Sequence, residues 1–318
     1  MSEHVRPKDS RKRLWVLLSL AVLTLLAVLY VREYKFSRPV GEGPAGATIP
    51  DEPFQSEWTD RHVYVLGIGD SITAGLGADS QSHRYFNRVL FNPPDEFEEM
   101  KGLCLSAVLP NLAHENLAVS GSESQLHYDV VKDQVVEQST ESFGIVLMTS
   151  GGNDLIHMYG RSPPRECAMY GATIEQAEPW IDRYANRLRE MFSLLISRFP
   201  GGCEIYIGDI YDPTDGQGDA PSIFLPDWPD GLAIHARYNE SIRSIADEFE
   251  NVHVVPLHST FMGHGSHCRQ WWLDSYCETD PHYWFYTNVE DPNDRGYDAI
   301  RRAFLLTIVD NTSLRNRD

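Results

Sequence analysis

The sequence predicts an α/β protein in which helices cover both faces of a parallel sheet, with a membrane-spanning helix at its N-terminus. Three observations support this fold class. Short apolar, β-branched runs alternate with amphipathic stretches through most of the 318 residues. Each run leads into a turn that contains Gly, Ser or Asp, as expected for consecutive βαβ units. Near the N-terminus, one uncharged apolar segment is long enough to cross a bilayer.

The membrane segment is Leu14–Val31, eighteen uncharged residues interrupted by only two polar ones, Ser19 and Thr24. At ~1.5 Å per residue such a helix covers about 27 Å, close to the hydrocarbon thickness of a bilayer. Residues 1–13 form a basic tail, so the positive-inside rule predicts a cytoplasmic N-terminus and a single pass. The alternative is a cleaved signal peptide, although the run is long and no small residues follow it.

The charge of the chain is divided between a basic head and an acidic body. Up to Pro39 there are eight basic and three acidic residues, whereas the rest of the chain has 19 basic and 43 acidic ones. An acidic body argues against nucleic-acid binding, which depends on clustered Lys and Arg. The 42% of hydrophobic residues argues against a disordered chain.

Composition also suggests the domain boundaries. Residues 32–60 are predicted as a linker that holds the body off the membrane, because 39–53 are rich in Gly, Pro and Ala. Residues 61–311 are predicted as one domain and 312–318 as a C-terminal tail, since roughly 250 residues suit a single α/β domain. Five cysteines leave disulfides and free thiols equally open.

Strands and helices are predicted from the period of their apolar residues. The expected strands are His62–Ile68, Leu117–Val119, Ile145–Met148, Ile205–Ile207 and Val252–Leu257. The expected helices are Trp180–Phe199, Leu232–Phe249 and Asp294–Val309. Because ligands bind at the carboxyl ends of parallel strands, the chemistry of the protein is expected just after each strand.

Three residues after successive strands suit acyl transfer. Ser71 follows Gly69-Asp70 on a turn into a helix, where its hydroxyl is exposed and its N–H is free to bind an oxyanion. Gly121 allows the backbone to approach a ligand closely, and Asn153 offers a side-chain amide donor. A hydroxyl nucleophile with three donors is the equipment for a tetrahedral intermediate.

The segments that hold these residues, GDSITAG, NLAVSG and GGND, resemble the first three blocks of the SGNH (GDSL) hydrolase superfamily. The resemblance extends over about Arg61 to Asn311. It implies a flavodoxin-like three-layer sandwich with a central parallel sheet. It also implies that Ser71 is the nucleophile, and that the oxyanion is held by the Ser71 and Gly121 amides and the Asn153 side chain.

The fourth block of this sequence departs from the superfamily. The superfamily usually ends with Asp-x-x-His, but here Asn288 stands at the position of the Asp and Asp291 at that of the His. An imidazole with a pKa near ~6.5 suits a general base at neutral pH far better than a carboxyl with a pKa near ~3.9. The residue that accepts the serine proton is therefore an open question.

Three hypotheses remain for the base. A histidine of the loop after the fifth strand takes the proton, with His267 slightly preferred over His264 and His282 as a further candidate. Alternatively Asp291 does so itself, with a pKa raised by burial. In the third hypothesis Ser71 is not catalytic, and the pocket only binds an acyl or glycan group.

The function predicted from these observations is that of a membrane-tethered, exported SGNH-type serine ester hydrolase. It would act as an esterase or deacetylase on an acylated carbohydrate or lipid, without cofactor or metal. Its partners would be a small-molecule or glycan ester and the membrane, and not a nucleic acid. The alternatives are an O-acyltransferase and a non-catalytic surface binding module on the same fold.

Overall fold

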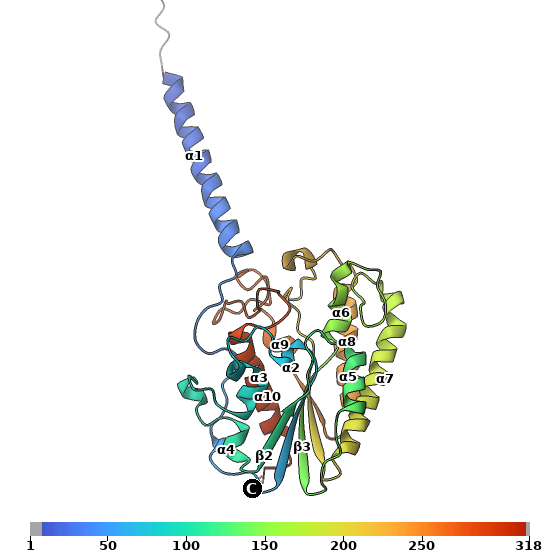
Figure 1. The fold of residues 1–318 in the computed structure, drawn as a ribbon. Coiled ribbons are helices and arrows are strands. Elements are labelled where there is room, and N and C mark those ends of the chain that lie inside the picture. The colour runs from blue at the N-terminus through green and yellow to red at the C-terminus, as the bar shows by residue number, and fades with distance from the viewer. Residues whose placement is uncertain (1–7, 316–318) are drawn as a thin grey trace, which may run out of the picture.

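A five-stranded parallel sheet in the order β2-β1-β3-β4-β5 forms the centre of the molecule (Figure 1). The computed structural model describes residues 8–315, with side chains from residue 12 onward. Strands β1 and β3 pair from His62 with Ser142 to Ile68 with Met148. The strands are β1 His62–Ile68, β2 Leu112–Asn116, β3 Ser142–Thr149, β4 Cys203–Gly208 and β5 Val252–Val255.

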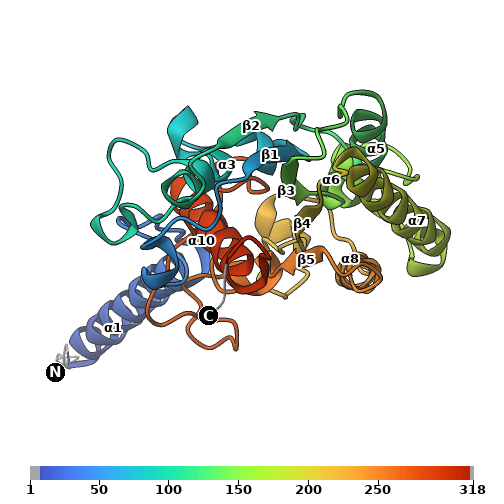
Figure 2. The same ribbon diagram turned by 90° about the horizontal axis from the view of Figure 1, so that it is seen from below.

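Helices cover both faces of the sheet, which confirms the predicted α/β class (Figure 2). One face carries α5 Ser124–Asp133, α7 Ile174–Arg198 and α8 Gly231–Ala246, and the other carries α3 Tyr85–Leu90 and α10 Asp294–Asn311. A separate hydrophobic core fills each side. The short helices are α2 Ser71–Ala74, α4 Leu105–Val108, α6 Gly152–Ile156 and α9 Leu257–Phe261. Single 3-10 turns are η2 Glu52–Phe54, η3 Gln81–His83, η4 Glu98–Met100, η5 His157–Gly160 and η6 Ala220–Ile223.

The strand predictions hold except at the edge of the sheet. Strand β1 has the predicted bounds, β3 and β4 contain the predicted runs, and β5 ends before Pro256. The second prediction, Leu117–Val119, is wrong, because β2 lies at Leu112–Asn116. This strand is at the edge of the sheet and its second half is exposed, so its polar residues do not form the apolar run that the prediction sought.

The long helices begin where their caps indicate. The Thr173 hydroxyl and the Gln176 side chain form a capping box, so α7 starts at Ile174, earlier than apolar spacing alone predicted. Helix α10 starts at the predicted Asp294, since the Asn293 side chain accepts the Gly296 N–H at 3.0 Å.

The N-terminal helix α1 (Lys8–Val31) continues into a π-helical turn, η1 (Arg32–Phe36). Within residues 8–315, one helix, Lys12–Phe36, is long and apolar enough to cross a membrane, and its apolar window is wholly unburied. A membrane anchor and a signal sequence share these properties. Residues 1–7 of the predicted cytoplasmic tail and 316–318 of the C-terminal tail lie outside the described residues.

The segment predicted as a free linker instead packs against α10. Ala45 and Ile49 are buried, and the Ala45 N–H donates to an Asp298 carboxylate oxygen at 2.9 Å. The Arg295 guanidinium donates to three backbone carbonyls of residues 40–44. Charged side chains of α10 therefore satisfy the polar backbone of a Gly- and Pro-rich stretch whose composition alone indicated a tether.

All five cysteines are free thiols, so Cys268 and Cys277, the pair closest in sequence, form no disulfide. Cys268 is fully buried, and burial raises the pKa of its thiol to about 12. This thiol therefore stays protonated and unreactive at neutral pH.

Candidate active site

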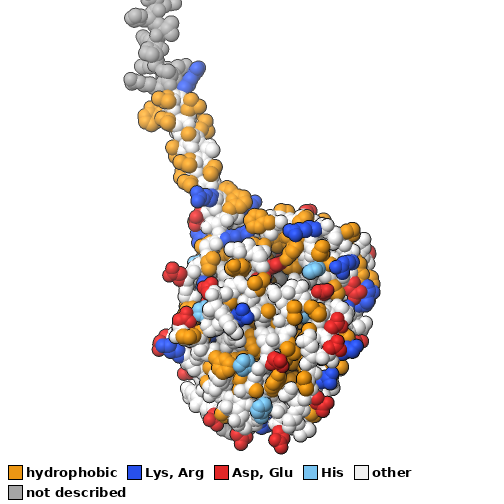
Figure 3. Space-filling model, viewed as in Figure 1, with side chains coloured by type: hydrophobic (Ala, Val, Ile, Leu, Met, Phe, Trp, Pro, Cys, Tyr) orange, Lys and Arg blue, Asp and Glu red, His pale blue; other side chains and the backbone are white. Residues whose placement is uncertain are grey.

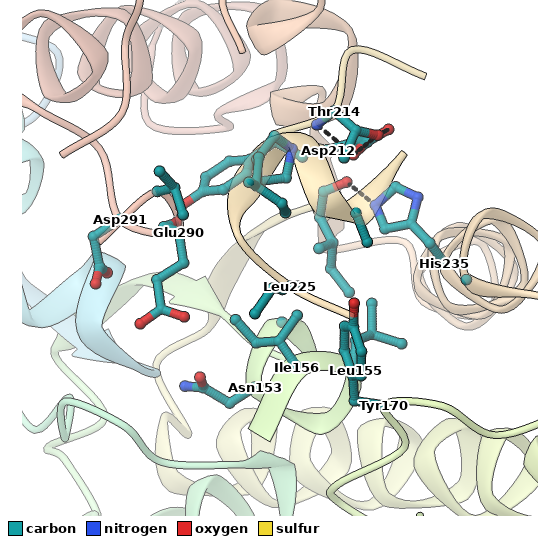
Figure 4. A pocket seen from close by; sticks show the side chains of 18 of the residues that line it. Asn153, Leu155, Ile156, Tyr170, Asp212, Thr214, Leu225, His235, Glu290 and Asp291 are labelled. Atoms are coloured by element: carbon teal, nitrogen blue, oxygen red, sulfur yellow. Dashed lines mark hydrogen bonds between the residues drawn. The ribbon is translucent and has the colours of Figure 1, made fainter. Parts of the chain in front are cut away.

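A cavity of about 400 Å³ lies at the carboxyl ends of β1, β3 and β4. This volume is in the range of sites that bind small molecules. Asn153, Glu290 and Asp291 lie on one side of it and His235 on the opposite side (Figure 4). The wall between them is mainly apolar and includes Leu155, Ile156, Ile210, Tyr211, Leu225 and Leu232.

Ser71 reaches this cavity because of the turn that precedes it. Gly69 has φ 142°, and a Cβ atom there would lie 2.5 Å from the Thr149 carbonyl oxygen, so only glycine fits. The Asp70 carboxylate accepts the Ile72 N–H at 3.1 Å and the Thr149 hydroxyl at 2.8 Å. These bonds fix Ser71 as the first residue of α2. Burial raises the pKa of Asp70 to about 6.

Asn153 lines the same cavity from the start of α6. The residue before this helix, Gly151, has φ 95°, and a Cβ atom there would meet the Tyr184 hydroxyl at 2.7 Å. The Asn153 amide donates to the Ser122 carbonyl at 2.9 Å, which links α6 to the loop after β2. Gly121, at φ 80°, immediately precedes Ser122 and is exposed. The structure thus brings Ser71 and Asn153 to one cavity and places Gly121 in the adjoining loop.

Asp291 lies directly against the nucleophile candidate. The Ser71 side chain interacts with the Asp291 carboxylate, which is 2% exposed, and this contact lowers the pKa of that carboxyl. The Asn288 amide donates to the same carboxylate at 2.6 Å, and its oxygen accepts the Asp291 N–H at 3.1 Å. Burial raises the pKa of Asp291, while the bonds from Ser71 and Asn288 act in the opposite direction.

A second carboxylate, Glu290, stands beside this pair. It accepts the Tyr159 hydroxyl at 2.7 Å, and burial with the nearby Asp291 and Asp70 raises its pKa. Three residues of the cavity wall have left-handed backbones that are unusual for side chains of their size, namely Tyr159 at φ 50°, Phe224 at φ 64° and Val289 at φ 62°. Such strained backbones cluster at functional sites.

The loop histidines do not reach Ser71. The His264 ring stacks on Trp284 with centroids 3.4 Å apart, and its Nδ1 atom pairs with the His282 carbonyl. Burial lowers the pKa of His264 to about 4. His267 lies between the Ser266 hydroxyl at 2.9 Å and an Asp219 carboxylate oxygen at 3.0 Å. Neither histidine lines the cavity.

One buried carboxylate determines the conformation of the loop that carries His264 and His267. Asp215 accepts the backbone N–H groups of Gly263, Gly265 and His267 at 2.8 to 2.9 Å. Burial raises the pKa of Asp215 to about 6. The loop is therefore held against residues 212–219, and its imidazole rings contact neighbouring residues of the same region. His282 is likewise engaged, with the Asp280 carboxylate.

Tyr159 and His235, which also line the cavity, were not among the residues predicted from the sequence. The His235 ring pairs with the Ile210 carbonyl at 2.9 Å, and burial lowers its pKa. Its place in the apolar face of a predicted helix was the only available signal. Tyr159 lies on a strained turn after α6, and neither the period of apolar residues nor a motif predicts this turn.

A parallel sheet with a serine after β1 and a cavity at the strand ends is the arrangement expected of an SGNH-type ester hydrolase. The chain belongs to the GDSL-like Lipase/Acylhydrolase family, whose profile matches residues 68–299. The activity class of the family is that of an esterase or lipase, which confirms the resemblance seen in the three sequence blocks.

Solved structures with the same fold include a catalytic mutant of an acetylxylan esterase from Geobacillus stearothermophilus. It is 18% identical with a TM-score of 0.51, and the match covers 82% of this chain and 100% of that one. Phospholipase A1 from Streptomyces albidoflavus NA297 is 17% identical with a TM-score of 0.47, over 79% of this chain and 100% of that one. No curated protein sequence matches the chain.

Proposed function

We propose that the chain is a membrane-tethered, exported serine ester hydrolase that acts on an acylated carbohydrate or lipid. In this proposal Ser71 is the nucleophile and Asp291, rather than a histidine, accepts its proton. The observation that carries the proposal is the contact of the Ser71 side chain with the buried Asp291 carboxylate, both in the wall of one cavity. Tethering rests on the length and apolar character of Lys12–Phe36.

The proposed reaction has two stages. The Ser71 oxygen bonds to the ester carbonyl carbon as its proton passes to Asp291, and the departing alcohol then takes that proton. In the second stage water bonds to the acyl carbon as Asp291 accepts its proton. The bond between that carbon and the Ser71 oxygen then breaks, Asp291 returns the proton to the Ser71 oxygen, and the carboxylic acid leaves. If a sugar hydroxyl replaced the water, the same acyl-enzyme would give an O-acyltransferase.

A carboxylate is a weak base, and three features of the site offset this weakness. Burial raises the pKa of Asp291 and so increases its proton affinity. The Asn288 amide donates to the carboxylate and its carbonyl oxygen accepts the Asp291 backbone N–H, so that Asn288 orients Asp291 as an aspartate would orient a histidine. The contact between the two side chains lets the proton pass from Ser71 to Asp291 without an intervening residue.

The oxyanion of the tetrahedral intermediate would be held by the backbone amides of Ser71 and Gly121 and by the Asn153 side chain. Asn153 now donates to the Ser122 carbonyl. It would therefore have to exchange this bond for the oxyanion, or share its second amide hydrogen with it. Each such donor is worth about 10²–10³ in kcat where it has been removed from other enzymes.

The test uses the full chain with p-nitrophenyl acetate and a fluorophosphonate probe. Ser71→Ala should abolish turnover and labelling, and Asp291→Asn should lower turnover by about 10²–10⁴, because an amide cannot accept the proton. His267→Gln, which keeps a hydrogen-bonding side chain, is the matched control and should retain both activities. Loss of labelling in His267→Gln with full labelling in Asp291→Asn would overturn the assignment of the base.

A further inference from the structure

The apolar N-terminal helix leaves the domain at the end that carries the cavity. Helices α2, α6 and α9, which follow the carboxyl ends of their strands, lie at the end from which α1 rises (Figure 1). Contacts of α1 and η1 with the domain lie at this end. Glu33 pairs with Arg269 at 2.8 Å, and the rings of Tyr30 and Trp272 stack with centroids 6.4 Å apart.

The chain that follows η1 also touches the mouth of the cavity. The Arg38 guanidinium lies 5.6 Å from the centre of the Phe224 ring, and it donates a hydrogen bond to the Ser222 carbonyl. Phe224 lines the cavity, yet it is 82% exposed and has the strained backbone described above. The apolar ring of Phe224 is thus exposed to solvent at the entrance of the cavity, next to the segment that joins α1 to the domain.

Further aromatic side chains are exposed around the base of α1. Phe36 is 68% exposed, Trp271 55% and Trp272 45%. Tryptophan rings are enriched at the bilayer interface, where their apolar face and polar N–H both find a partner. We call Phe36, Phe224, Trp271 and Trp272 the aromatic rim. Figure 3 shows hydrophobic side chains gathered at the base of α1, on a body that is otherwise rich in acidic groups.

Basic residues accompany the aromatic rim. Arg32, Lys35 and Arg38 follow α1 directly, and Arg269 contacts both Glu33 and the Tyr34 ring. Basic side chains near a bilayer surface are attracted to its anionic headgroups. The rest of the body is strongly acidic, so this is the end of the domain that approaches such a surface at the lowest electrostatic cost.

We infer that the aromatic rim docks on the bilayer that holds α1, and that the cavity takes its substrate, a lipid ester with a hydrocarbon chain, directly from that bilayer. The hydrocarbon chain of a lipid ester that enters past Phe224 would contact Leu225, Ile156 and Leu155 on the cavity wall. Apolar surface of this kind replaces the hydrocarbon of the bilayer without exposing the chain to water. The inference rests on the proposed function and narrows its substrate to a lipid.

The first experiment compares two esters with the full chain reconstituted in phosphatidylcholine vesicles. One ester, 4-methylumbelliferyl oleate, is dissolved in the bilayer, and the other, p-nitrophenyl acetate, is in solution. The double variant Trp271→Asp/Trp272→Asp changes two rim residues outside the cavity, and Val136→Asp is the control. Val136 is 71% exposed and lies between α5 and β3, at the opposite end of the sheet.

We expect the double variant to lower hydrolysis of the oleate ester by at least about tenfold, because the rim no longer enters the interface. Hydrolysis of the acetate should stay unchanged, and Val136→Asp should affect neither ester. An unchanged oleate rate, or an equal loss on both esters, would overturn the inference. If the wild type hydrolyses acetate but not oleate, the inference fails while the proposed function stands. If it hydrolyses neither, both fail.

A second measurement does not depend on activity. In a Trp15→Phe background, which removes the tryptophan of α1, brominated phosphatidylcholine quenches only tryptophans that enter the bilayer. We expect quenching in this background and its loss when Trp271 and Trp272 are also changed to Phe. Absence of quenching in the Trp15→Phe protein would show that the rim does not touch the bilayer and would reject the inference.

Discussion

If Asp291 is the general base, as we propose, it determines how the activity of this site depends on pH. Its carboxylate must be ionised to accept the Ser71 proton, and burial raises its pKa above the ordinary value. Activity is therefore present at high pH and is lost as the pH falls through this raised pKa, above the ordinary carboxyl value of about 3.9.

Asn288→Ala should move the acid limb of the pH profile, the range in which activity is lost on acidification, to still higher pH. The variant removes a hydrogen bond that lowers the pKa of Asp291, so the carboxylate is protonated earlier on acidification. The profile of kcat/KM against pH, measured for the wild type and the variant, checks the sign. A limb that moves to lower pH, or stays in place, would contradict the role given to Asn288.

The departure from the family motif can be reversed at the same two residues. The double variant Asn288→Asp/Asp291→His restores the Asp-x-x-His block and puts an imidazole beside Ser71. Its acid limb is expected near the ordinary histidine pKa of ~6.5. Esterase activity at neutral pH that equals or exceeds that of the wild type would support a shared geometry. A folded but inactive double variant would show that the cavity is built around a carboxylate.

Residues placed by a local motif were predictable, and those placed by tertiary contacts were not. Ser71 and Asn153 follow strands directly, so the motif and the parallel sheet together predict that they meet. The histidine hypothesis depended on where the loop after β5 folds. That path is set by Asp215, a residue 48 or more positions earlier whose carboxylate collects three of the loop's N–H groups.

At the scale of elements, α10 connects the site to the stability of the domain. It starts three residues after Asp291 and carries Asp298, which is buried and pairs with Arg301 at 2.6 Å and Arg302 at 3.1 Å. Arg301 also pairs with Glu96. The sequence predicted this helix with its correct start, but its charged residues sit in the interior, which amphipathic spacing does not reveal.

Asp298→Ala should therefore destabilise the protein strongly. It removes the carboxylate that Arg301 and Arg302 share, so that they keep only Glu96 and Glu99, and the Ala45 N–H loses its acceptor. Each lost hydrogen bond to this charged group contributes about 1.5–3 kcal/mol. Glu98→Ala is the control, because the pair of Glu98 with Lys101 is exposed, and surface changes usually stay within about 0.5 kcal/mol. Free energies of unfolding from urea titration measure both. Equal effects of the two variants would contradict the structural role of Asp298.

At the scale of the whole molecule, residues 37–50, which connect the N-terminal helix to the domain, pack against α10. Ala45 and Ile49 are 4% and 5% exposed, and Asp298 accepts the Ala45 N–H. Packing of this segment restricts the orientations of the body relative to α1, which favours docking of the aromatic rim. Composition could not reveal it, because the groups that fix this segment lie some 250 residues later, on α10.

A chain that begins at Arg38 should consequently be more stable than one that begins at Asp51. The shorter chain loses the burial of Ile49, worth about 1.5–3 kcal/mol, and the bond from Ala45 to a carboxylate, worth about 1.5–3 kcal/mol. Ile49→Ala in the full chain isolates the apolar part and should cost about 2 kcal/mol or more. Urea unfolding of the three proteins measures these differences. If the two truncated chains unfold at the same urea concentration, the segment is a tether after all, and the restricted orientation of the cavity toward the membrane has no structural basis.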